Sequence, residues 1–347
     1  MTTYLIIAAI VLIGVLIFQI SKANEYVAQL RGEDEAHYES DVINGRMWLV
    51  FGFVFLIGVF WSAWEFKDRF LPEAASVHGK WIDSMFNTTL FFTGIIFVLT
   101  HIALFYFAWK YRQKKGKVGY YYPENNKLEM WWTIIPAIVL TILVVIGLYN
   151  WFRIMGPAPA NAREVEITGK QFNWLIRYPG KDGKLGKKEF NLIDDVNSVG
   201  INFNDNAALD DIMTNELHFE VNQPYLLRIN ARDVIHSVGL NHFRIKMDAM
   251  PGIPTHFWFI PDITTDEMRK KTNNPDFNYE MNCDMICGKG HSAMKAMVYV
   301  DTPEQYQAWL AKQPSFFDSA IKGADEEKKF KPAMASAVTS PVSQSKL

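Results

Sequence analysis

The chain has 347 residues, 49% of them hydrophobic, and a formal net charge of −2 at pH 7. Basic and acidic residues nearly balance both before and after Phe152, so neither part has the strongly basic character of a nucleic-acid-binding protein. We therefore expect no nucleic-acid partner.

Four long stretches without a charged residue lie before residue 153. A helix needs about 20 apolar residues to cross the hydrocarbon core of a bilayer, and each stretch is near that length. We therefore expect four transmembrane helices in a lipid bilayer. The first stretch lacks a basic start and a small-residue cleavage site, so we expect it to be retained. The stretches are residues 1–21, 47–64, 84–109 and 130–152.

The loop at residues 110–129 holds six Lys and Arg residues, and such a concentration is typical of the cytoplasmic side. This orientation puts the segment after residue 152 on the periplasmic side. The lack of an amphipathic transit peptide favours a bacterial plasma (inner) membrane. His101 is the only histidine or charged residue within the four stretches, and we expect it to contact a neighbouring helix rather than to act chemically.

The remaining sequence predicts a β domain over residues 153–312. Short runs of β-branched and aromatic residues alternate with turn-forming residues, a pattern typical of a β-sandwich or barrel. The long polar stretch 181–216 is interpreted as a surface insertion, and Thr302 as the cap of a short helix. The segment 313–347 ends in small polar residues and prolines, and we expect it to be disordered or loosely packed.

One short stretch carries most of the metal-binding chemistry. The sequence EMNCDMICGKGHSAM contains Cys283, Cys287, His291 and Met294 in the pattern C-x3-C-x3-H-x2-M. A disulfide between the two cysteines would close only a small loop and stabilise little. Thiolate and thioether sulfur select soft metals, so a metal site is the better interpretation.

A further ligand must come from elsewhere in the chain. His236 is the best candidate because it lies between two predicted strands, and His242 and His256 are weaker candidates. Zinc would leave Met294 unused, and a mononuclear blue-copper site would leave one cysteine over. A dinuclear copper centre uses every donor, with a backbone carbonyl such as that of Met285 completing it. We favour the dinuclear copper centre, with zinc as the alternative.

The sequence resembles subunit II of cytochrome c oxidase, of the haem–copper oxidases, over residues 84–312. The resemblance implies a transmembrane helical hairpin followed by a cupredoxin-like Greek-key β-sandwich or barrel that holds a dinuclear copper (CuA) centre. The matching segments, in the same order and spacing, are LEMWWTIIPAIVL at 128–140, GKQFNWLIRY at 169–178, DVIHS at 233–237, KMDAMPG at 246–252 and CDMICGKGHSAM at 283–294.

The function that the resemblance implies is that of an electron relay. Electrons from a cytochrome c donor would pass through copper to haem in subunit I, which reduces oxygen to water and translocates protons. The alternative from another class is a membrane-anchored copper-binding or copper-delivery protein. The implied copper ligands are His236, Cys283, Met285 through its carbonyl, Cys287, His291 and Met294.

The resemblance also assigns residues around the centre. Phe172, Trp174 and Asp233 match positions of the donor-docking surface, and Glu129 matches the carboxylate at the mouth of a proton path into subunit I. Family members usually carry glutamate where Met285 stands. That glutamate contributes to a magnesium or manganese site shared with subunit I, and a thioether cannot replace it because such cations prefer oxygen.

Two other departures concern the donor. Phe172 replaces a tryptophan of the family, and the helices at 1–21 and 47–64 are additional to the hairpin. Without that indole, the docking surface is less suited to a freely diffusing donor, and the extra membrane helices can hold another complex nearby. We therefore expect a tethered cytochrome c domain as donor. We expect that domain to come from a supercomplex with a neighbouring quinol-oxidising complex.

Overall fold

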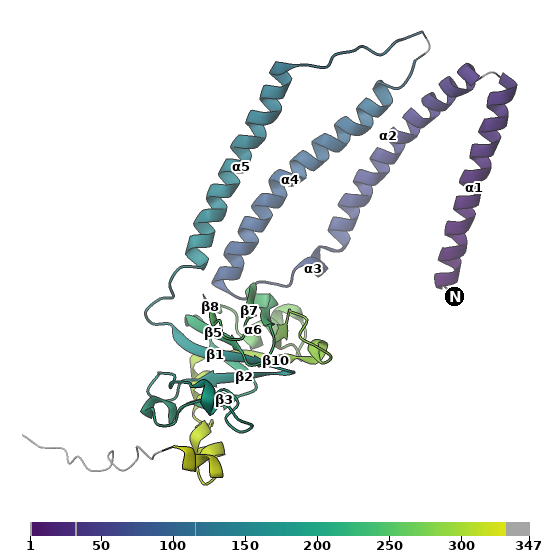
Figure 1. Ribbon diagram of the computed structural model, residues 1–347. Helices are drawn as coiled ribbons and strands as arrows, with labels where there is room; N and C mark the ends of the chain where they lie inside the picture. The colour runs from purple at the N-terminus through teal and green to yellow at the C-terminus, as the bar shows by residue number, and fades with distance from the viewer. Residues whose placement is uncertain (1, 32, 115, 331–347) are drawn as a thin grey trace, which may run out of the picture. The chain divides into compact units, whose positions relative to one another are not determined.

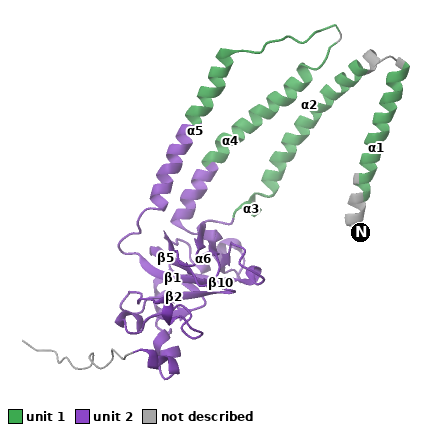
Figure 2. Cartoon of the chain, in the orientation of Figure 1, with its two compact units in different colours: residues 1–71, 88–139 green, residues 72–87, 140–347 purple. Residues whose placement is uncertain are grey.

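The computed structural model describes residues 2–31, 33–114 and 116–330 (Figure 1). The chain divides into two compact units (Figure 2). One unit comprises residues 1–71 with 88–139 and is helical. The other comprises residues 72–87 with 140–347 and contains the β domain.

The long helices have the length and composition of membrane spans. Four of them, α1, α2, α4 and α5, are long and apolar enough to cross a bilayer, which agrees with the four predicted spans. They extend past the uncharged stretches into polar flanks. The helices of this part are α1 Thr2–Arg31, α2 Glu33–Glu65, the single turn α3 Lys67–Phe70, α4 Val77–Lys110 and α5 Asn126–Ile154.

His101 packs between two helices of the first unit. Its ring stacks on Phe55 of α2, with centroids 5.5 Å apart, and its Nδ1 lies 2.7 Å from the carbonyl oxygen of Phe97 one turn earlier. Phe105, one turn later, occupies the space beside Gly52, where a Cβ atom would clash with its ring. These contacts fit the helix-packing interpretation of His101.

The β domain consists of two five-stranded sheets, ordered β3-β2-β1-β5-β8 and β4-β10-β9-β6-β7. The β1–β5 and β4–β10 pairs are parallel and the other pairs are antiparallel. The strands are β1 Arg163–Lys170, β2 Asn173–Tyr178, β3 Ile212–Thr214, β4 Leu217–Glu220, β5 Tyr225–Ala231, β6 His236–Leu240, β7 Ile245–Ala249, β8 Thr255–Phe259, β9 Tyr279–Cys283 and β10 Lys295–Asp301.

Alternating side chains of the two sheets form one apolar core, as expected of a β-sandwich. Ile167, Trp174, Leu227, Val238 and Phe259 are among its buried members. The prediction of long apolar helices followed by a β-sandwich domain is confirmed.

Two short helices accompany the sheets, one in the connection between β8 and β9 and one directly after β10. They are α6 Thr265–Thr272 and α7 Pro303–Leu310, each begun by a threonine capping box. The predicted cap at Thr302 is therefore confirmed, since its hydroxyl accepts the N–H of Gln305. Single helical turns lie at Phe190–Leu192, Asn206–Ala208, Asn241–Phe243, His291–Ala293, Phe317–Ile321 and Asp325–Lys329.

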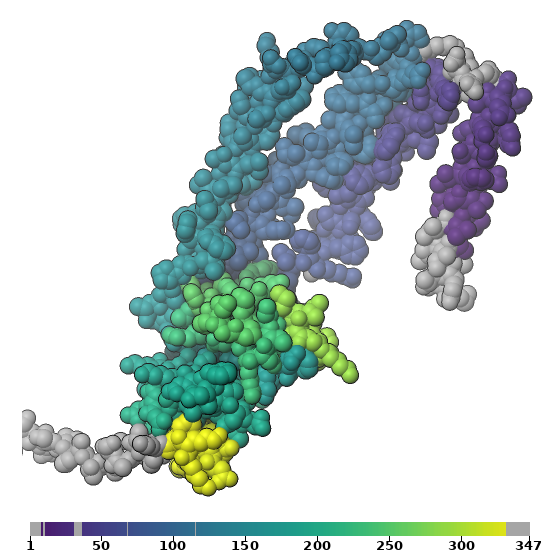
Figure 3. Space-filling model, in the orientation of Figure 1, coloured from purple at the N-terminus to yellow at the C-terminus, as the bar shows by residue number. Residues whose placement is uncertain are grey.

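A second, smaller core lies between the polar insertion and the C-terminal segment. Ile201 and Phe203 of the insertion are buried together with Phe317, Ile321 and Phe330, and Figure 3 shows this last segment in yellow against the teal insertion. Loose packing from residue 313 is therefore wrong for the segment up to residue 330, because its three apolar side chains find a partner surface. Residues 331–347 lie outside the described part of the chain.

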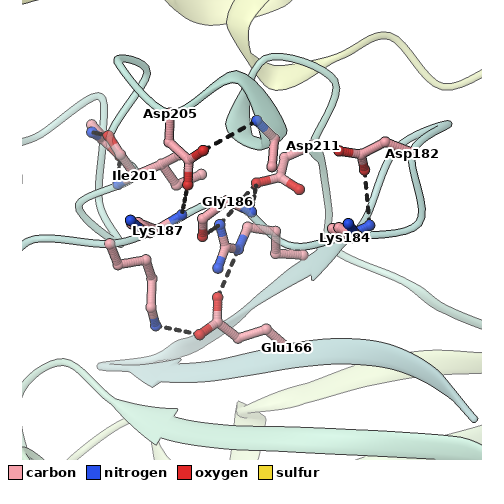
Figure 4. A network of polar contacts seen from close by, with 12 residues as sticks. Glu166, Asp182, Lys184, Gly186, Lys187, Ile201, Asp205 and Asp211 are labelled. Atoms are coloured by element: carbon pink, nitrogen blue, oxygen red, sulfur yellow. Dashed lines mark hydrogen bonds and ion pairs between the residues drawn. The ribbon is translucent and has the colours of Figure 1, made fainter. Parts of the chain in front are cut away.

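A buried charged network fastens the insertion to the first sheet (Figure 4). Arg177 of β2 donates from Nε to Glu166 of β1 at 2.7 Å and from Nη1 to Asp211 at 2.9 Å. Gly186 donates its N–H to the same oxygen of Asp211 at 3.1 Å, and Lys188 pairs with Glu166. Since the Arg177, Glu166 and Asp211 side chains are almost fully buried, their charges are neutralised within the protein.

Candidate metal centre

The three central strands of the second sheet, β10, β9 and β6, bring the predicted ligands together at one end of the strands. β9 ends at Cys283, the following loop returns to β10, and β6 begins at His236. The N–H of Cys283 donates to the carbonyl of Met294 at 3.1 Å, which closes the loop, and the N–H of Asp284 donates to Ser237 on β6 at 3.0 Å. The ligand loop is thus held to both neighbouring strands.

The two thiols form the middle of the site. Cys283 Sγ and Cys287 Sγ are 3.9 Å apart. Cys283 Sγ lies 3.8 Å from Nδ1 of His236, and Cys287 Sγ lies 3.7 Å from Nδ1 of His291. Each thiol therefore has its own imidazole.

Each thiol also has one further donor. The carbonyl oxygen of Met285 is 3.2 Å from Cys283 Sγ, and the thioether sulfur of Met294 is 3.9 Å from Cys287 Sγ. Both cysteines and Met294 are buried. All six donors predicted from the sequence therefore lie together: the two thiols, and four further donors around them.

The two imidazoles do not converge on a single point. The donor atoms of His236, Cys283 and Cys287 all lie within 4.8 Å of one another, and His291 is not part of this group. A closed tetrahedral zinc site needs four donors around one cation. An arrangement with one imidazole at each end of a thiol pair instead suits two adjacent cations.

The chemistry of the thiols also fits a bound cation. Burial, together with the neighbouring Cys283, raises the pKa of the Cys287 thiol to about 11. At neutral pH the thiol would keep its proton unless a cation compensated the thiolate charge. Cysteine thiolates and a methionine thioether, together with two imidazoles, form a soft donor set of the kind that copper prefers.

The orientation of His236 depends on Asp233. The Nε2 atom of the ring lies 2.8 Å from Asp233 Oδ1. Burial alone would raise the pKa of Asp233, but hydrogen bonds from the Gln171 N–H and from His236 outweigh it and hold the pKa below its usual value. The ionised carboxylate accepts the Nε2–H, which leaves the lone pair of Nδ1 directed to the thiols.

Aromatic residues cover the centre at two depths. Phe172, in the turn between β1 and β2, is 40% exposed, whereas Trp174 on β2 is only 2% exposed. The Trp174 ring packs edge-on against His236, with centroids 5.9 Å apart. Of the two aromatic residues assigned to donor docking, Phe172 reaches the surface and Trp174 lies beneath it.

Other predicted residues lie away from these donors. His242 is turned toward the Glu73 carbonyl, 3.0 Å from its Nδ1, and His256 is exposed on β8. Glu129 lies in the first turn of α5, where its carboxylate accepts the N–H of Asn125 at 3.4 Å. Gln171, which sequence reasoning missed, donates from its side chain to the Cys287 carbonyl at 2.6 Å. A lone glutamine without a spacing pattern gives no signal for such a contact.

Comparison with known proteins gives matches over most of the chain. Residues 62–151 match the transmembrane domain of cytochrome c oxidase subunit II, and residues 164–300 match its periplasmic domain. The alternative cytochrome c oxidase subunit 2 of Bradyrhizobium diazoefficiens is 33% identical over 238 residues, covering 68% of this chain and 81% of that protein. Cytochrome c oxidase subunit 2 of Thermostichus vulcanus is 27% identical over 264 residues, covering 69% and 77% respectively.

Among solved structures, the periplasmic domain of subunit II of cytochrome oxidase from Bradyrhizobium japonicum is similar at 22% sequence identity. The match covers 50% of this chain and 100% of that one, with a TM-score of 0.31.

Proposed function

Because the chain belongs to the cytochrome c oxidase subunit II family, we propose that the thiols of Cys283 and Cys287 and the four donors around them hold the dinuclear copper centre of this oxidase subunit. The family implies copper of the CuA type, a partner subunit I in an oxidase complex, and a membrane anchor with the soluble domain on the periplasmic side. The observation that carries the proposal is the thiol pair with one imidazole at each end.

The proposed role of the ligand residues is to hold the copper pair in a rigid geometry suited to electron transfer. When bound, the copper pair accepts and releases one electron at a time. Cys283 and Cys287 would hold the copper pair as thiolates, and burial keeps water from these sulfurs. Asp233 holds His236 in one tautomer, and the Cys283–Met294 backbone bond holds the loop. Ligands that cannot move limit the rearrangement that accompanies each electron transfer.

The proposal also includes the route by which electrons arrive. Phe172 is the aromatic residue exposed above the ligand loop, and Trp174 lies beneath it against His236. We place the docking surface of a cytochrome c donor around Phe172. The chain transforms no substrate, since oxygen reduction occurs in subunit I.

The metal content tests the proposed function. The full-length subunit, purified within its oxidase complex, is expected to hold two coppers beyond those of subunit I and to show a mixed-valence electron-spin signal shared equally by both. One zinc per chain in place of this copper would contradict the proposal. Ready transfer of copper from the purified complex to another protein would instead favour the alternative, a copper-delivery role.

Features outside the β domain support two further proposals. Helices α1 and α2 precede the hairpin, and helices can hold another membrane complex beside the oxidase. Tethering raises the donor's effective concentration to roughly millimolar, so a tethered cytochrome c domain in a supercomplex of the bacterial inner membrane is proposed as donor. Deleting residues 1–64 while preserving assembly tests this. Unchanged quinol-driven oxygen uptake, with no larger complex lost on native gels, would contradict it.

Glu129 is proposed as the mouth of a proton path, a role supported by its position in the matching segment at the start of α5. Its carboxylate also accepts the N–H of Asn125. In Glu129→Gln the amide oxygen still accepts that bond, so helix stability is kept while the acidic proton is lost. Slower proton uptake with unchanged copper is expected, and an unchanged uptake rate would contradict the role.

A further inference from the structure

The ligands of the centre come from two separate parts of the chain. His236 begins β6, whereas the two cysteines, His291 and Met294 belong to the β9–β10 loop. A third segment, the two-residue turn between β1 and β2, lies between these parts. We propose that Gln171 in this turn is a positioning residue that sets His236 against the thiol pair, an inference that rests on the proposed copper-binding function.

Gln171 makes one hydrogen bond to each part. Its backbone N–H donates to Asp233 Oδ2 at 2.7 Å, and its side-chain amide donates to the Cys287 carbonyl at 2.6 Å. Asp233 uses its other oxygen to accept the Nε2–H of His236 at 2.8 Å. A continuous series of bonds thus runs from His236 through Asp233 and Gln171 to Cys287.

Both bonds of Gln171 are short. Their donor–acceptor distances of 2.7 Å and 2.6 Å lie at or below the short end of the usual range for N–H···O hydrogen bonds. The amide of Gln171 spans 116 residues of sequence to reach the ligand loop. Through these contacts a displacement of the turn would move His236 and Cys287 relative to each other.

The packing of the ligand loop supplies an independent observation. A Cβ atom at Gly288 would lie 3.0 Å from Gln171 Nε2, and Gly288 has φ +136°, a conformation that side chains rarely adopt. A Cβ atom at Gly290 would lie 2.5 Å from Cγ of Phe172. Both glycines therefore allow the Gln171–Phe172 turn to approach the loop backbone closely.

The position of the turn matters because the sharing of an electron between two cations depends on where each imidazole lies relative to the thiol pair. Functional geometry must be held within about 0.5 Å by supporting hydrogen bonds. Loss of the Gln171 amide would leave the Cys287 carbonyl without this partner and free the loop to shift. The expected result is a less symmetric copper pair that also releases its metal more readily.

Gln171→Met tests the amide directly. Methionine has a similar length and keeps the backbone N–H that donates to Asp233, but it lacks the side-chain donor. The matched control is Gln223→Met, because Gln223 donates its amide to the Asn161 carbonyl at 2.7 Å in the same domain. Both variants are prepared as full-length subunits in the assembled oxidase. The readouts are the copper hyperfine pattern of the electron-spin spectrum and copper loss to bathocuproine disulfonate.

The proposal predicts a localised or unequal hyperfine pattern and about 10–100-fold weaker copper retention in Gln171→Met, with Gln223→Met unchanged. A native pattern with native retention in Gln171→Met would overturn it. A third variant, Gln171→Ala, removes both the amide and the bulk of the side chain. If the hyperfine pattern or the copper retention changes in Gln171→Ala but not in Gln171→Met, packing rather than the amide is responsible, and the proposal is overturned. A wild-type subunit without two coppers contradicts the proposed function instead, and this measurement is made first.

Discussion

Asp233 accepts a hydrogen bond from Nε2 of His236 at 2.8 Å, while the other nitrogen of the same ring faces Cys283 Sγ at 3.8 Å. The carboxylate that the family resemblance assigns to donor docking is therefore also the partner of a proposed copper ligand. A charged partner fixes the tautomer and the orientation of a ligating imidazole. Docking and positioning by Asp233 are separable by experiment.

Asp233→Asn removes this charge with little change in size. Because an amide is a weaker acceptor from the imidazole N–H, copper affinity is expected to fall about 10–100-fold, as measured by competition with a chelator. The exposed Asp276→Asn serves as the control carboxylate. Unchanged copper retention with a raised KM for the cytochrome donor would show that Asp233 acts in docking alone.

Cys287→Ser and Met294→Leu separate a central ligand from a peripheral one. Cys287 lies within 4 Å of Cys283, His291 and Met294, so losing its sulfur should abolish the shared-electron signal. Met294→Leu keeps the volume of a fully buried side chain and removes only a weak thioether ligand, so it should mainly shift the reduction potential. Spectra and redox titrations of the two variants provide the measurement. If both keep the native spectrum and potential, these residues are not ligands.

Most of the candidate site could be predicted because its donors are local. Cys283, Cys287 and His291 are spaced four residues apart in one loop. Residues so close in sequence are also close in space in most loop conformations. His236 could be chosen from the histidines because it begins a strand, where a side chain is held firmly. The β-sandwich followed from alternating apolar residues bounded by turns.

The remaining features depend on contacts between distant segments. Trp174 shares the buried face of β2 with Ile176, whereas Phe172 precedes the strand and is free of that alternation. The polar, proline-containing composition near the C-terminus concealed Phe317 and Ile321, whose partners lie more than a hundred residues earlier. The amino-acid composition of a segment does not show which other part of the chain the segment packs against.

Met285→Glu is expected to create a manganese site at the junction with subunit I. The Met285 carbonyl faces Cys283 while its side chain is partly exposed, so a carboxylate there would be available to a hard cation that prefers oxygen. Wild-type oxidase grown with manganese should bind it weakly or not at all, as measured by electron-spin resonance. Ile286→Glu, at a highly exposed neighbour, controls for added charge. Tight, stoichiometric manganese in the wild type would show that other groups replace the carboxylate.

Arg177→Met should strongly destabilise the β domain. Arg177 joins Glu166 and Asp211 in the buried network, and removing one partner of buried charges costs about 3–5 kcal/mol because the others remain unpaired. Arg228→Met is the matched control, since Arg228 pairs with Glu164 across β5 and β1 at 2.7 Å but has a side chain 54% exposed. Solvent screening limits that pair to about 1 kcal/mol or less.

Urea unfolding of the full-length, metal-free subunit in detergent, followed by tryptophan fluorescence, compares the two variants. The network joins the insertion to β1 and β2, so Arg177→Met should also expose the insertion to limited proteolysis before the sandwich unfolds. Equal unfolding midpoints for Arg177→Met and Arg228→Met would contradict the argument. That result would mean that the insertion is held mainly by its apolar contacts with Phe317, Ile321 and Phe330, and that Glu166 and Asp211 find other partners when the guanidinium is absent.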